Sequence, residues 1–154
     1  MQTFFSRAHQ LRNPQTELYG GELVSPYESP NRVDLVLDAL VAADLGLITE
    51  AERRDLGVAG QVHDADYLVC LETCWADWQS AGHRGGLISY VWPGRRMTSA
   101  RIPTSIAGKV GYYALSADTA ISGGTFEAAV SSQSVGLSAT DAVLEGARGA
   151  FGLC

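Results

Sequence analysis

Three histidines are the side chains of this sequence best suited to bind a metal ion or to act as a general base. His9, His63 and His83 are far apart along the chain, and none belongs to a motif such as His-Glu-x-x-His, which presents two ligands on one helix face. We therefore predict no zinc site from these residues alone. His63 directly precedes Asp64, a helix-capping residue type, and is interpreted as a structural histidine at a helix start.

Nucleophilic catalysis has equally little support in the sequence. Cys70 and Cys74 lie four residues apart without a second pair, and three cysteines fit neither a disulfide framework nor a zinc ribbon. Neither Cys70 nor Cys154 has the electropositive surroundings of a reactive thiol. The sequence also lacks a Gly-x-Ser-x-Gly elbow and a Walker-type phosphate loop. We predict reduced, buried cysteines and no complete catalytic site.

The composition excludes several classes of protein. With 154 residues, 46% hydrophobic and 18% charged, the chain has the balance of a globular domain. A net charge of -6 argues against nucleic-acid binding, which requires clustered Lys and Arg, and it suits a cationic substrate. The apolar stretches fall short of the roughly 18 residues of a membrane span. Because no secretory signal precedes the first strand, we expect a cytoplasmic protein that does not enter a membrane.

The pattern of apolar residues predicts an α/β protein. The expected elements, in chain order, are a strand over 3–6, helices over 29–46, 64–82 and 125–144, and a strand over 150–154. In the first helix, Val33, Val36, Leu37 and Leu40 recur at steps of three and four, as in an amphipathic helix. The aromatic stripe of the second helix is interpreted as core. A strand, then helices, then a strand indicate a parallel sheet flanked by helices.

Two long segments show no regular period and are predicted to be loops. They cover residues 10–30 and 82–111, which are rich in Gly, Pro and polar residues. Long loops inside a compact domain are often functional. The first of them, 10–30, is therefore the first place to look for a site.

Several short motifs together carry a resemblance to a known family. Residues 11–14 lead into the first, Thr-Glu-Leu-Tyr-Gly-Gly-Glu-Leu-Val over 16–24. The others cover 62–68, 71–73 with Trp75, 92–93, 95–96, 101–104, 111–113, 119–122, 124–125 and 127–129. Each is weak alone, but their order and spacing run nearly without gaps through the chain. The sequence resembles the bacterial acetylpolyamine amidohydrolases of the histone-deacetylase-like family.

The resemblance implies the arginase/deacetylase fold and a zinc-dependent deacetylation. In these enzymes zinc and paired histidines activate water against an acetamide carbonyl, and a tyrosine helps to stabilise the oxyanion. Their paired histidines follow directly after the strand that matches 150–154, and the zinc ligands lie further on. The chain would thus be the N-terminal part of one deacetylase domain over 1–154, with an incomplete sheet. We expect no catalytic residue and no metal ligand in it, and no activity of the chain alone.

The resemblance also places two segments at the rim of the active site and at a homodimer interface. Glu17 matches an acidic residue at the mouth of the tunnel, where a carboxylate attracts the ammonium groups of acetylated polyamines, and Tyr19 matches a neighbouring aromatic. From the residues alone, Glu17 is an ordinary exposed carboxylate. Within the predicted loop 82–111, the segment 82–106 resembles the loop through which these enzymes form homodimers and narrow their tunnel. Ala107 stands where some relatives carry a second acidic residue, which weakens the expected selection for polyamines.

Other functions stay open at this point. The substrate could be another acetylated amine, such as acetyl-lysine. Alternatively, the chain is a non-catalytic remnant that binds a partner or dimerises through 82–111. For the chain alone we expect aggregation or association through strands, because the last strand lacks a partner on its outer edge.

Overall fold

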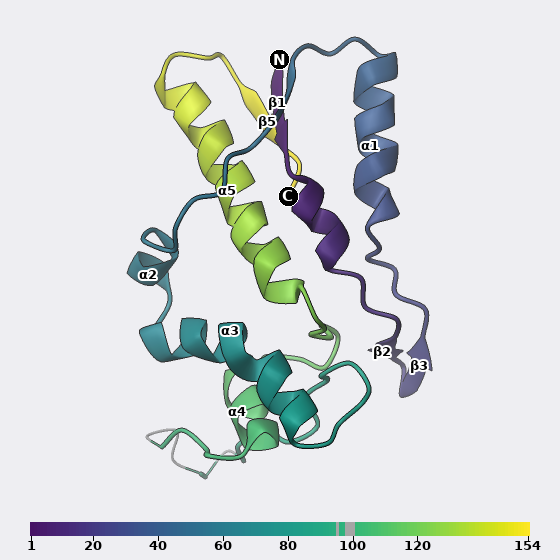
Figure 1. The fold of residues 1–154 in the computed structure, drawn as a ribbon, viewed down its shortest axis with the longest axis vertical. Helices are drawn as coiled ribbons and strands as arrows, with labels where there is room; N and C mark the ends of the chain where they lie inside the picture. The colour runs from purple at the N-terminus through teal and green to yellow at the C-terminus, as the bar shows by residue number, and fades with distance from the viewer. Residues whose placement is uncertain (95, 98–100) are drawn as a thin grey trace. The chain divides into compact units, whose positions relative to one another are not determined.

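The computed structural model describes residues 1–94, 96–97 and 101–154 of the chain, which divide into two compact units (Figure 1). The first unit, here the sheet unit, comprises 1–13, 28–59 and 124–154. The second, here the hairpin unit, comprises 14–27 and 60–123. That these residues form one part of a single domain stays a prediction.

The sheet unit is built on three parallel strands. Strand β1 (Gln2–Phe5) lies between β4 (Ile48–Glu50) and β5 (Ala150–Gly152). Thr3 and Phe4 of the central strand are buried, as expected for a parallel strand covered on both faces. The α/β class with a parallel sheet is confirmed. The last strand, β5, belongs to this sheet and is one of its two outer strands. The sequence did not reveal β4, because three residues are too few to show a period.

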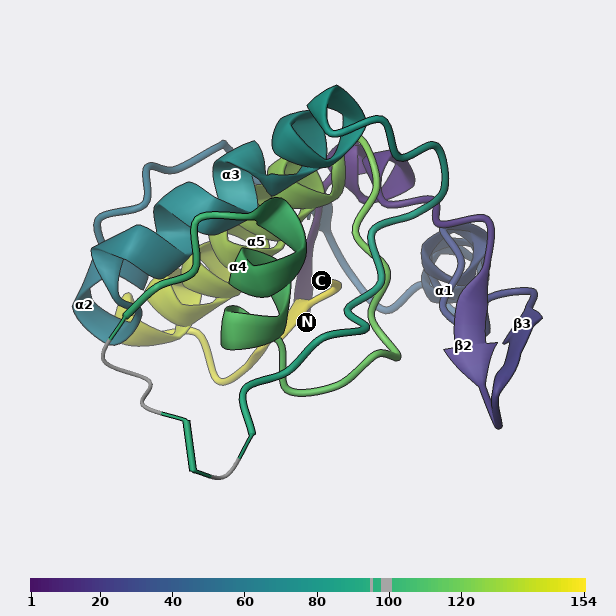
Figure 2. The same ribbon diagram turned by 90° about the horizontal axis from the view of Figure 1, so that it is seen from below.

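Two helices flank this sheet, α5 (Thr125–Leu144) on one side and α1 (Asn31–Ala42) on the other (Figure 1 and Figure 2). Helix α5 packs on β1, β5 and the short 3-10 helix η1 (Arg7–Leu11). The predicted bounds of α5 are confirmed. Its N-cap is Gly124, whose φ of 85° is left-handed and whose missing Cβ would lie 2.7 Å from the Leu11 carbonyl oxygen.

Helix α1 is shorter than predicted, because the chain leaves the helix at Ala43 and reaches the expected stop, Gly46, only after a turn. Of the predicted apolar stripe, Leu40 is buried, whereas its neighbours are half-buried or exposed. Leu35 and Val41 each expose 67% of their surface. The helix therefore carries apolar residues well beyond the stripe that packs on the unit.

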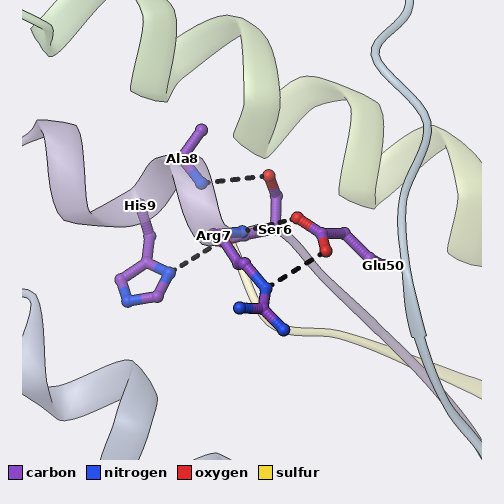
Figure 3. A network of polar contacts seen from close by, with 5 residues as sticks. All are labelled: Ser6, Arg7, Ala8, His9 and Glu50. Carbon is purple, nitrogen blue, oxygen red and sulfur yellow. Dashed lines mark hydrogen bonds and ion pairs between the residues drawn. The ribbon is translucent and has the colours of Figure 1, made fainter.

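Figure 3 shows how the end of β1 is fixed. The Ser6 hydroxyl accepts a hydrogen bond from the Ala8 amide at 3.2 Å, and the Ser6 carbonyl accepts one from Nδ1 of His9 at 2.7 Å. Glu50, at the end of β4, accepts from both the Arg7 amide and Arg7 Nε, each at 3.3 Å. The bonds of Glu50 join the ends of β1 and β4. The bond from Ala8 to Ser6 caps the start of η1, which follows β1.

The hairpin unit contains two packed helices, α3 (Ala65–Ser80) and α4 (Ile106–Tyr113), and an antiparallel hairpin of β2 (Glu17–Tyr19) and β3 (Glu22–Val24). A short helix, α2 (Ala59–Val62), precedes α3. The buried core of this unit consists of Cys74, Trp78, Leu87 and Val110. The prediction that the aromatic stripe of α3 packs a core is confirmed for Trp78. Among the described residues, no helix has both the length and the apolar character needed to span a membrane.

The two predicted loops contain regular structure, which corrects the prediction. Within 10–30 lies the hairpin, whose turn residues Gly20 and Gly21 have φ values of 60° and 89°. Both values are left-handed, as a two-residue type I′ hairpin turn requires. Within 82–111 helix α4 begins, because the Ser105 hydroxyl caps the Gly108 amide at 3.2 Å. At Gly111 a Cβ would overlap the Val91 carbonyl oxygen, so close packing selects glycine inside a helix.

Candidate functional site

The hairpin brings the two predicted substrate-binding residues to one face. Glu17 pairs with Val24 and Tyr19 pairs with Glu22 across the two strands. Side chains two residues apart in a strand point to the same side of a sheet. Glu17 and Tyr19 therefore share a face, with Glu17 half-buried and Tyr19 65% exposed.

A third residue, Tyr27, joins this face and was not predicted from the sequence. The backbone amide of Tyr27 donates a hydrogen bond to Oε2 of Glu17 at 3.3 Å. The rings of Tyr19 and Tyr27 meet edge to face, with centroids 6.0 Å apart and planes at 75°. Because these contacts join residues on opposite sides of the hairpin turn, no periodicity could predict them. The Gly20-Gly21 pair between β-prone residues could have revealed the hairpin itself.

The start of the second predicted loop is held in place by Trp78. Its ring stacks on His83 at 3.6 Å with 13° between the planes, and its Nε1 donates to the Gly85 carbonyl at 2.9 Å. Leu87 then pairs with Ile121 through two backbone hydrogen bonds of 2.8 and 2.9 Å. Residues 83–87 are thus an ordered extension of the core.

The later part of this segment is described in part only. Arg95, a member of the matching motif over 95–96, lies outside the described residues, as do 98–100. Trp92 donates from Nε1 to the Ala114 carbonyl at 3.2 Å. Ala107, at the position that is acidic in some relatives, lies in the first turn of α4 and is half-buried. The roles of this segment at a rim or a dimer interface stay predictions.

The histidines have separate surroundings in the described parts of the chain. His9 is 10% exposed, and its Nε2 lies 3.5 Å from Oδ1 of Asp34. His63 contacts the ring of Tyr67 at 5.4 Å, and His83 stacks on a tryptophan. Within residues 1–94, 96–97 and 101–154, no three His, Cys, Asp or Glu side chains are close enough to hold a metal ion.

The cysteines are unsuited to nucleophilic attack. Burial raises the pKa of the Cys74 thiol to about 11, and burial also raises that of Cys70, against the opposing effect of Lys109. A raised pKa keeps the thiol protonated, so the reactive thiolate is scarce near neutral pH. Of the predicted buried thiols, Cys74 is buried, Cys70 is half-buried and Cys154 is exposed, which corrects the prediction for Cys154.

A tyrosine cluster links α3 to α4. The Tyr113 hydroxyl donates to Oδ2 of Asp66 at 2.8 Å, and its ring lies 5.5 Å from Tyr67. Burial and the bond to Asp66 raise the pKa of Tyr113, because ionisation would place a second negative charge beside the carboxylate. The hydroxyl therefore remains a donor, and the cluster acts as a joint between the two helices.

Comparison with known proteins gives this geometry a context. Over its whole length the chain is 47% identical to the acetylpolyamine amidohydrolase of Mycoplana ramosa and 37% identical to acetylpolyamine amidohydrolase 1 of Pseudomonas aeruginosa. The chain is a homologue of the N-terminal portion of acetylpolyamine amidohydrolases. It covers 45% of the length of each of these two relatives. No family model matches it.

The fold comparison leads to the same group of enzymes. A crystal structure of acetylpolyamine aminohydrolase from Burkholderia pseudomallei superposes on the chain with a TM-score of 0.89 at 25% identity. The superposition covers all of this chain and 44% of that structure. The fold expected from the resemblance is confirmed. Because the chain spans less than half of these relatives, the activity of a whole enzyme is a matter for proposal.

Proposed function

We propose that this chain forms part of a zinc-dependent deacetylase that hydrolyses the acetamide of acetylated polyamines. The observation that carries the proposal is the match along the entire chain, at 47% identity, to an enzyme named for acetylpolyamines. The hairpin face supports the same substrate class. A half-buried carboxylate beside exposed aromatic rings suits a ligand that ends in an ammonium group.

The described residues do not fit the zinc that this chemistry implies. Zinc in a hydrolase requires three protein ligands of the His, Asp or Glu type around one open position. No such group exists within the described ranges. When bound by other residues, zinc would polarise the acetamide carbonyl and activate water. The residues described here would form part of the rim past which the substrate reaches the zinc.

We propose accordingly that the 154-residue chain does not hydrolyse acetylated polyamines by itself. The measurement is acetate release from N-acetylputrescine with zinc present, with and without a chelator. We expect no release above the protein-free control. Chelator-sensitive release by the chain alone would contradict this part of the proposal.

The substrate class is tested by binding. N-Acetylputrescine and N-butylacetamide share the acetamide and the four-carbon chain, but only the first carries an ammonium group. Titration of the ¹⁵N-labelled chain should show tighter binding of N-acetylputrescine, and Glu17→Gln should remove most of the difference. A peptide with blocked termini, whose only amine is the acetylated amine of acetyl-lysine, serves as a second neutral ligand. Equal affinity for all three would contradict a site for cationic substrates.

The alternative, a non-catalytic module that associates with itself or a partner, has its own support. Leu35, Val41 and Leu47 are each about two-thirds exposed, and β4 and β5 are the outer strands of the described sheet. Exposed apolar residues and open sheet edges favour association. Light scattering after size exclusion tests the alternative: a defined dimer would favour a module, whereas heterogeneous aggregates would favour part of an enzyme.

A further inference from the structure

We infer that Tyr27 completes, with Glu17 and Tyr19, a site for the free ammonium end of the substrate: its backbone amide positions the Glu17 carboxylate, and its ring offers a surface for the cation. This inference rests on the proposed function. It extends the site by a residue that neither the motif nor its resemblance identified.

The amide of Tyr27 orients the carboxylate. Its hydrogen bond to Oε2 of Glu17 occupies one oxygen and restrains the side chain, while the other oxygen keeps its capacity to accept a bond from an ammonium group. A restrained carboxylate loses less conformational entropy when a ligand binds. The position of Tyr27 therefore favours a charged ligand at Glu17.

The ring of Tyr27 adds an electrostatic surface. Tyr19 and Tyr27 touch edge to face and remain 65% and 69% exposed. The edge-to-face contact holds the two rings together outside the core, so much of the surface of each ring faces solvent. A cation within about 6 Å of a ring centroid is attracted by the π-electrons. The two rings and the carboxylate are the elements from which proteins build ammonium sites.

A purely structural role would have a different appearance. An aromatic ring stabilises a hairpin mainly by removing apolar surface from water. At 69% exposure Tyr27 removes little of its own surface. Burial of apolar surface therefore explains the position of the Tyr27 ring poorly. Ligand binding explains better why one exposed ring is held against a second exposed ring.

The test compares two substitutions and two ligands on the complete 154-residue chain. Tyr27→Leu keeps the backbone amide and removes the ring, whereas Tyr27→Phe keeps a ring. For N-acetylputrescine we expect Tyr27→Leu to raise the dissociation constant about threefold, the effect of an exposed cation–π contact, and Tyr27→Phe to change it by less than about twofold. Binding of N-butylacetamide should be the same in all three proteins. Leu115→Ala, at a fully exposed residue away from the hairpin, is the matched control.

The outcomes separate this inference from the proposed function. If the unmodified chain binds both ligands equally, the ammonium site fails and the inference fails with it. If the unmodified chain prefers the cation and Tyr27→Leu retains the full preference, only the inference is overturned. Equal weakening of both ligands would also overturn it, because that result indicates a structural role.

A gain of affinity provides a check should Tyr27→Leu fail to fold. Indole has the strongest cation–π attraction of the aromatic side chains, so Tyr27→Trp should bind N-acetylputrescine at least as tightly as the unmodified chain. Weaker binding by a folded Tyr27→Trp protein would overturn the inference.

Discussion

Helix α3 and the β2–β3 hairpin belong to the same unit and both present aromatic side chains, but these side chains have opposite surroundings. Trp78 is 6% exposed, stacks on His83 and donates its indole N–H to a backbone carbonyl. Tyr19 and Tyr27 are about two-thirds exposed, and their rings meet edge to face. On the helix, aromatic residues at helical spacing build a core. On the hairpin, aromatic residues beside a carboxylate build a surface, so the element decides the role of the ring.

The largest expected effect comes from removing the buried ring. Trp78→Ala should lower the free energy of unfolding by about 3–5 kcal/mol, through lost burial, a cavity and an unpaired Gly85 carbonyl. Tyr19→Ala should change it by no more than about 0.5 kcal/mol, because the side chain is exposed. Urea unfolding followed by circular dichroism measures both. Similar losses for the two variants would contradict the contrast between core and surface.

Two glycines sharpen the contrast at the level of backbone packing. Gly111→Ala should destabilise the chain by about 1–3 kcal/mol, because a Cβ would overlap the Val91 carbonyl oxygen. Gly136→Ala, in helix α5, has open space and should stabilise it by about 0.5–1 kcal/mol through helix propensity. Thermal unfolding measures the pair. A stable Gly111→Ala protein would show that α4 does not pack as described.

A substitution in the hairpin turn should have a smaller effect, which is seen mainly in the affinity for the ligand. A Cβ at Gly21 meets no atom within 4 Å, but the residue has a φ of 89°. Gly21→Ala should therefore cost about 1 kcal/mol of backbone strain and disturb the face that carries Glu17. N-Acetylputrescine should bind more weakly while the shifts of the α3 core stay in place. Unchanged binding would separate the ligand site from the hairpin.

The smallest expected effect concerns Glu22, which the register places on the same face as Glu17 and Tyr19. A second, exposed carboxylate there should favour ligands with two ammonium groups. Glu22→Gln should weaken N-acetylspermidine about twofold and N-acetylputrescine less, within the range of exposed ion pairs. The salt dependence of both titrations provides the check. If Glu22→Gln weakened both ligands equally, Glu22 would have no part in distinguishing ligands with two ammonium groups from ligands with one.

The sequence predicted the long helices and the two terminal strands, β1 and β5, but missed the other short elements. Helix α5 was recognisable from its length and apolar spacing. Strand β4 and the hairpin strands have three residues each, too few for an alternating pattern to show. Helix α4 was hidden by two glycines: Gly108 packs against Pro103, just before the helix, and Gly111 packs against Val91.

The candidate site shows a similar division. Glu17 and Tyr19 came from the resemblance of a motif, since physical pattern alone gave an ordinary exposed carboxylate. Tyr27 could not be found in this way, because its contacts are with residues on the other side of the hairpin turn. Sequence reasoning therefore identified the segment that is proposed to carry the site, and the structure gives the geometry within that segment.

The most direct test of the account is a map of the amide shifts caused by N-acetylputrescine in the ¹⁵N-labelled chain. The account predicts that the largest shifts fall within 16–27 and that N-butylacetamide reproduces few of them, while the resonances of the α3 core remain still. Shifts centred on α3, or a map that is the same for both ligands, would contradict the claim that the hairpin receives the cationic end of an acetylated polyamine.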